Sequence, residues 1–116
     1  MSMGYGNNIS RQVRNGIAKV SPTWTRLLAT GTTPMPGRQW IEIQARGTTA
    51  IAIGYSNKGS DGLFAEPSYN AHSAKIIPTN AFKGEPLGDS VMMWGRAVNK
   101  VTSAAGGCKV IVTEYS

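Results

Sequence analysis

The sequence predicts an all-β fold, either a β-sandwich or a jelly-roll-like barrel, with an extended N-terminal arm. Charged residues make up only 16% of the chain, which also contains 14 glycines. Such a composition favours short strands joined by turns over helices. Seven or eight short apolar segments recur at roughly regular spacing between Gly- and Pro-containing stretches, as in two-layered β proteins. With 116 residues, the chain has the size of one domain.

We expect the arm to comprise residues 1–20 and the single β-sandwich domain to comprise residues 21–116. Residues 1–12 are rich in Gly, Asn and Ser, a composition typical of an arm that is disordered or orders only on contact with a partner. The apolar spacing over residues 13–20 fits either a short helix or an extended stretch. The arm is therefore predicted to be needed for assembly and dispensable for folding.

The clearest pattern in the chain lies in two neighbouring segments, residues 38–44 and 49–55. Each alternates with period two, as half-buried strands do. The isoleucines of each segment share one face: Ile41, Ile43, Ile51 and Ile53. With a turn at Gly47 between them, the two segments are predicted to form an antiparallel hairpin whose isoleucines contribute to the core.

Further strands are expected on both sides of this hairpin. Stretches rich in Gly, Pro, Ser, Thr, Asn or Asp separate them at residues 30–37, 56–62 and 102–107, and these are predicted loops. The strand candidates are Trp24–Ala29, Leu63–Ala65, Ala74–Pro78, Ala81–Phe82, Val91–Val98 and Lys109–Tyr115.

Residues for catalysis or metal binding are scarce. Cys108 is the only cysteine and His72 the only histidine, so neither an internal disulfide nor a Cys- or His-rich metal site is expected. We interpret Cys108 as a small buried strand residue and His72 as a surface loop residue. The six carboxylates show no spacing typical of an acid–base pair. The sequence therefore predicts a non-enzymatic protein without catalytic residues, metal or cofactor.

Apolar runs in the chain are short. The longest have four residues, at Ala50–Ile53 and Val91–Trp94, against the ~20 that a membrane span requires. The N-terminal residues contain no apolar segment typical of a signal peptide. We expect no membrane association and no export from the cell that makes the protein.

The net charge of +6 originates in the first half of the chain. Residues 1–58 carry seven basic residues against Glu42 alone, which indicates a surface that meets phosphates or an acidic protein. The candidate partner-binding residues are Arg11, Arg14, Lys19 and Arg26.

The tryptophans allow two interpretations. Together with nearby arginines, they could stack on a sugar or on single-stranded nucleic acid. Because Trp40 and Trp94 lie in predicted strands, core packing is favoured for both, and Trp24 is left open.

Two segments together resemble a known group of proteins. GRQWIEIQARGTTAIAIGYSNKGSDGLF, residues 37–64, has two alternating strands and a Gly-rich loop, and SAAGGCKVIVTEYS at the C-terminus has a small turn and a Val-rich strand. This pattern resembles the small β-sandwich accessory proteins of tailed-bacteriophage virions, although the first 35 residues match nothing in it.

The resemblance implies a non-enzymatic part of a virion that is assembled in the host cytoplasm. We expect a capsid decoration or cement protein that binds the major capsid protein or other virion proteins as a homo-oligomer, with a trimer as the expected form. A head–tail joining or tail component is an alternative within the virion. Outside it, the alternatives are a basic β-barrel that binds single-stranded nucleic acid and a sugar-binding module.

Overall fold

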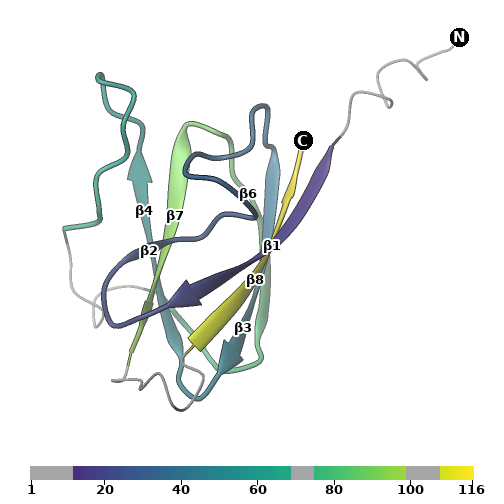
Figure 1. The fold of residues 1–116 in the computed structure, drawn as a ribbon, viewed down its shortest axis with the longest axis vertical. Coiled ribbons are helices and arrows are strands. Elements are labelled where there is room, and N and C mark those ends of the chain that lie inside the picture. Colours follow the sequence, from purple (N-terminus) through teal and green to yellow (C-terminus); the bar gives the residue numbers. More distant parts are fainter. Residues whose placement is uncertain (1–11, 69–74, 99–107) are drawn as a thin grey trace, which may run out of the picture.

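The computed structural model describes residues 12–68, 75–98 and 108–116. Within these ranges eight strands form two antiparallel sheets of four, packed face to face as a sandwich (Figure 1). The strands are β1 (Val13–Val20), β2 (Thr25–Arg26), β3 (Trp40–Gly47), β4 (Ile51–Asn57), β5 (Lys75–Ile77), β6 (Phe82–Pro86), β7 (Val91–Ala97) and β8 (Cys108–Tyr115). The predicted all-β fold is confirmed. No helix long and apolar enough to cross a membrane occurs in these ranges.

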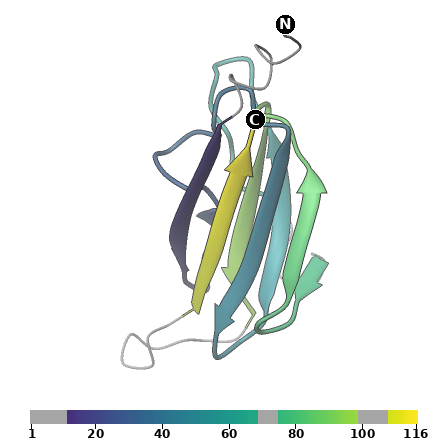
Figure 2. The ribbon, with the colours of Figure 1, turned by 90° about the vertical axis from the view of Figure 1, so that its right-hand side faces the viewer.

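The order of the strands shows that most pairing is between distant parts of the chain. Sheet A has the order β1-β8-β3-β6, and sheet B has the order β2-β7-β4-β5. Figure 2 shows the four strands of sheet A side by side, with β4 and β7 of sheet B behind them. The first strand pairs with the last, so the two ends of the domain are held together within one sheet.

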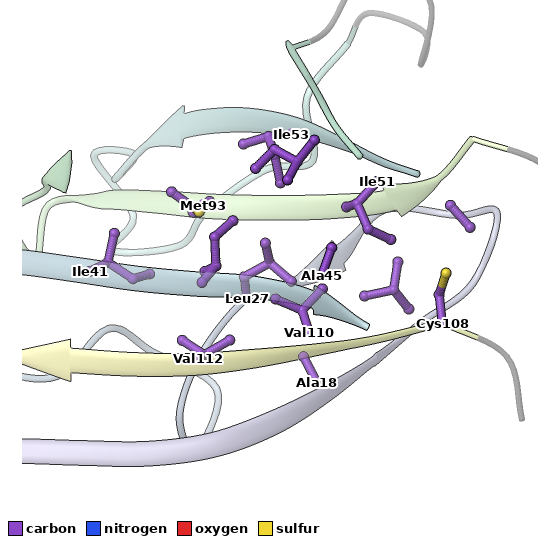
Figure 3. Close-up of a cluster of buried hydrophobic side chains, with 14 of the residues drawn as sticks. Ala18, Leu27, Ile41, Ala45, Ile51, Ile53, Met93, Cys108, Val110 and Val112 are labelled. Atoms are coloured by element: carbon purple, nitrogen blue, oxygen red, sulfur yellow. The ribbon is translucent and has the colours of Figure 1, made fainter. Parts of the chain in front are cut away.

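The apolar core fills the space between the two sheets (Figure 3). Because side chains alternate between the faces of a strand, each sheet contributes every second residue to this layer. The four isoleucines that the alternation assigned to the core are all buried, with at most 1% of each side chain exposed. The same holds for Cys108, whose Sγ donates a hydrogen bond of 3.3 Å to the Thr49 carbonyl.

The predicted hairpin between residues 38 and 55 is wrong. Its two strands exist, but β3 lies in sheet A and β4 in sheet B, so they face each other across the core. The pairing partners of β3 are β8 and β6, whereas those of β4 are β7 and β5. Alternation identifies the residues that face the core. It is the same whether two successive strands pair as a hairpin in one sheet or lie in opposite sheets joined by a short link.

The predicted arm also requires correction. All eight residues of β1 pair with β8, from Val13 opposite Tyr115 to Val20 opposite Cys108. The extended alternative for residues 13–20 is therefore right, and this segment belongs to the fold, because Ala18 and Val20 are buried in the core. A deletion of residues 1–20 would remove an edge strand. Residues 1–11 lie outside the described residues.

Two of the shorter strand predictions do not hold as stated. Of residues 24–29, only Thr25 and Arg26 form a strand. The backbone N–H of Leu27 still donates to the Met93 carbonyl of β7, whereas that of Ala29 donates to Glu114 of sheet A. The segment Leu63–Ala65 contributes a single isolated bridge, from Phe64 to Lys58. Trp24 and Phe64, one from each segment, pack on the outer face of sheet B against a small buried cluster of Leu28, Met92 and Trp94, whereas Leu27 and Ala29 belong to the main core.

A buried ion pair holds the long link between β2 and β3. Arg38 Nη1 lies 2.8 Å from Glu114 Oε2, and both side chains are fully buried. The Glu114 carboxylate also accepts the backbone N–H groups of Ala29 at 2.9 Å and Met35 at 3.0 Å. The Arg38 guanidinium donates in addition to the backbone carbonyls of Leu87, Gly88 and Val91. These contacts connect the link to the β6–β7 loop and to the last strand.

Gly16 provides a test of how closely this link approaches β1. A Cβ atom at this position would lie 1.7 Å from the Ala29 carbonyl oxygen, so Gly16→Ala must displace either the strand or the link. We expect a loss of about 1–3 kcal/mol in the free energy of unfolding, measured by urea denaturation. Gly88→Ala is the control, since its nearest neighbour would be the Arg38 carbonyl oxygen at 3.9 Å. Equal stability of the two variants would contradict the close approach.

Candidate interaction surface

The outer face of sheet A carries most of the exposed large hydrophobic side chains of the described residues. Among the described residues, six large hydrophobic side chains are exposed. Four of them lie on this face: Val13, Ile17, Trp40 and Phe82. The half-buried Ile111 and Tyr115 lie on the same face, because they alternate with the buried residues of β8. Exposed apolar groups collected on one face are typical of a surface that binds another molecule.

The strand register arranges this outer face into rows that cross the sheet. Ile111 of β8 is opposite both Ile17 of β1 and Gln44 of β3, and Gln44 is opposite Phe82 of β6. We call these four residues the apolar row, since all but Gln44 are apolar. The next row towards one end of the strands consists of Lys19, Lys109 and Arg46, opposite one another on the same three strands. We call it the basic row.

The basic row places three like charges directly opposite one another, an arrangement that destabilises a sheet. All three side chains are exposed, and within the described ranges none of them forms an ion pair. The arrangement costs the isolated domain some stability, which an anionic partner would restore. This end of the face is therefore suited to carboxylate or phosphate groups.

Towards the other end of the face, Trp40 and Tyr115 lie beside the carboxylate of Glu42. The Tyr115 hydroxyl donates a hydrogen bond of 2.7 Å to Glu42 Oε1. The indole of Trp40 lies close to Gly84, where a Cβ atom would approach the ring to 3.2 Å. Glycine at this position thus allows the indole to lie against the strand, and 38% of Trp40 stays exposed.

The contact with Glu42 raises the pKa of Tyr115 above its usual 10.0, through the hydrogen bond first, then partial desolvation and the negative charge. Since the folded pKa exceeds the unfolded one, the stabilisation is complete below about pH 10 and is lost as the pH rises through the folded pKa. We expect Glu42→Gln to lower the pKa of Tyr115, measured by tyrosinate absorbance. The signal of Tyr115 is assigned from a Tyr115→Phe variant. An unchanged titration in Glu42→Gln would contradict this coupling.

The outer face of sheet B carries a second feature, an open hollow of about 530 Å³. Trp24, Arg26, Phe64, Glu66 and Trp94 are among the residues that line it. The guanidinium of Arg26 lies 5.4 Å from the centre of the Trp94 ring, and Trp94 Nε1 is anchored by a hydrogen bond of 2.8 Å to the Ser56 hydroxyl. A second guanidinium, from Arg96, lies 5.9 Å from the Trp24 ring. The hollow thus combines aromatic rings with cations.

The four candidate partner-binding residues do not form one patch. Lys19 belongs to the basic row, and Arg26 lies on the opposite side of the molecule in the hollow of sheet B. Arg14 is half-buried on the inward side of β1, opposite Glu114 in the register. Arg11 and the predicted surface residue His72 lie outside the described residues.

The sequence interpretation missed Lys109, Arg46 and Phe82 as surface residues of one face. Their shared position depends on pairing between strands far apart in the chain, which the local pattern does not contain. Alternation along β3 could have found one of the outward residues: Trp40 precedes the buried Ile41, so its side chain must lie on the other face of the sheet. The core assignment of Trp40 is accordingly wrong, whereas that of Trp94, which is 4% exposed, is confirmed.

No group of three or more potential metal-ligating side chains occurs among the residues that the structure describes. Comparison of the chain with protein-family models, curated proteins and solved structures finds no match. The chemistry of its surfaces is therefore the basis on which function is inferred.

Proposed function

We propose that the protein is a non-enzymatic structural component of a bacteriophage virion, a decoration protein that binds the assembled head and stabilises it. The observation that carries this proposal is the outer face of sheet A, where large apolar side chains from three strands are exposed beside a row of cations. Such a face is suited to a protein interface with an apolar centre and a charged rim. The resemblance of residues 37–64 to phage accessory proteins is the reason for placing the protein in a virion.

Stabilisation in this proposal follows from mass action. A protein that binds the assembled head and has no affinity for its dissociated subunits shifts the equilibrium towards the assembled form. No reaction is needed, and the domain contributes a rigid surface. The major capsid protein is the proposed partner within the virion, and the chain acts as a homo-oligomer.

The experiment is to titrate purified heads of the source phage with the chain and to measure cosedimentation. Ile17→Asp, on the outer face of sheet A, is compared with Ile76→Asp, because both isoleucines are exposed strand residues and Ile76 belongs to sheet B. We expect the wild type and Ile76→Asp to cosediment with heads and Ile17→Asp to lose binding. Absence of the chain from virions, tested with an antibody, would contradict the proposal.

A second candidate function, binding of single-stranded nucleic acid, is supported by the hollow on sheet B. The half-buried Trp24 supplies a ring face, with the guanidinium of Arg96 5.9 Å from it, and Arg26 supplies a further cation beside the buried Trp94. Its test is the affinity for oligothymidylate at increasing salt, since phosphate contacts make the affinity fall steeply. Arg26→Ala should weaken binding and reduce the salt dependence, whereas Lys58→Ala, outside the hollow, should change neither.

A further inference from the structure

The distribution of charge on the outer face of sheet A makes this face complementary to itself. We propose that it binds a second copy of the chain, related by a two-fold axis that crosses the strands at the apolar row. The contact rests on the proposed function and deepens it: the outer face of sheet A joins two copies of the homo-oligomer, and the dimer is the form that binds the head. It replaces the trimer expected from the sequence with a two-fold contact.

The geometry follows from the positions of two opposite charges on β3. Glu42 and Arg46 are placed two residues before and two residues after Gln44, which belongs to the apolar row. Each is thus about 7 Å along the strand from that row. A two-fold axis across the strands reverses the strand direction of the second copy and keeps the order of the strands. Arg46 of each copy then faces Glu42 of the other, and the contact forms twice.

The apolar row lies on this axis and packs against its own copy. Ile17, Ile111 and Phe82 of one copy face the same residues of the other, so exposed apolar surface is removed from water at the centre of the contact. Packed sheets are rotated by about 30° against each other. Because β8 and β3 are the two central strands of sheet A, their side chains are displaced least by this rotation.

The groups that would form the ionic contacts are available. The hydrogen bond from Tyr115 goes to Glu42 Oε1, which leaves Oε2 to accept the guanidinium of a second copy. Arg46 has no ion-pair partner within the described ranges. The same axis places Lys109 opposite Thr113 and Lys19 opposite Asn15 of the other copy, so the basic rows lie apart.

Other arrangements are less suited to this face. A two-fold axis parallel to the strands would bring the two basic rows together and oppose six cations, a repulsive contact. A nucleic acid strand running along β3 from Arg46 to Trp40 would pass the carboxylate of Glu42, which repels phosphates. The reversed two-fold contact satisfies both charges of β3 at once.

The test is a charge exchange measured by analytical ultracentrifugation. The wild type should sediment as a dimer whose population rises with concentration. Arg46→Glu and Glu42→Arg should each weaken dimerisation by at least about tenfold in Kd, because each creates two like-charge contacts. The double variant Glu42→Arg/Arg46→Glu should recover most of the lost affinity. Lys58→Glu, an exposed charge outside this face, is the matched control and should dimerise as the wild type does.

Circular dichroism and urea unfolding of each variant establish that it is folded. A monomer at high micromolar concentration, a trimeric mass, or a double variant as weak as the single ones would overturn the inference. A dimer that recovers in the double variant but never binds phage heads would contradict the proposed function and leave the two-fold contact intact. Binding of a monomeric chain to heads would overturn the two-fold contact and leave the proposed function intact.

Discussion

Arg38→Met is expected to lower the free energy of unfolding by about 3–5 kcal/mol, because it leaves the Glu114 carboxylate buried without its cation. The substitution also removes the donors that the guanidinium directs to the carbonyls of Leu87, Gly88 and Val91. Since total stability for a domain of this size is about 5–15 kcal/mol, the loss is a large share of the whole. Urea denaturation measures the loss.

Lys83→Met is the matched control for this ion pair. Lys83 lies 3.2 Å from Glu85, and both side chains retain 20–29% exposure. A partly exposed ion pair contributes about 0–1 kcal/mol, and the partner left behind can be hydrated. A similar loss of unfolding free energy in the two variants would contradict the argument that burial makes the Arg38–Glu114 pair costly to break.

Ile43→Ala should cost about 2–5 kcal/mol, from the lost transfer free energy of the side chain and the cavity that it leaves. Ile43 is 1% exposed and belongs to the packed layer between the sheets. Gln44→Ala, the next residue of β3 on the outer face, should change the free energy of unfolding by no more than about 0.5 kcal/mol.

Both variants are compared by their urea midpoints at a protein concentration low enough to keep the chain monomeric. The difference tests the phase of β3, because a slip of one residue would exchange its two faces. Greater sensitivity at Gln44 than at Ile43 would contradict the register with β8 and β6.

The candidate surface was only partly accessible to sequence reasoning. Lys19 was selected from the excess of positive charge in the first half of the chain, and it does lie on the outer face of sheet A. Its neighbours Lys109 and Arg46 come from strands that are far from it in the chain. Their cations meet because β8 inserts between β1 and β3, a pairing that no local pattern encodes.

The class of the fold and the phase of the most regular strands follow from local sequence pattern. Alternation with period two reflects the geometry of a single strand, and it correctly assigned Ile41, Ile43, Ile51 and Ile53 to the core. The tertiary structure alone decided which strands pair, and so placed β3 and β4 in opposite sheets and brought β1 into the fold. Trp40 and Trp94 show the same division: both lie in strands, but only Trp94 has the link after β2 and the segment around Phe64 packed over it. The physical reason is that strand pairing and the covering of a sheet face depend on contacts between distant residues, whose energies no short window of sequence contains.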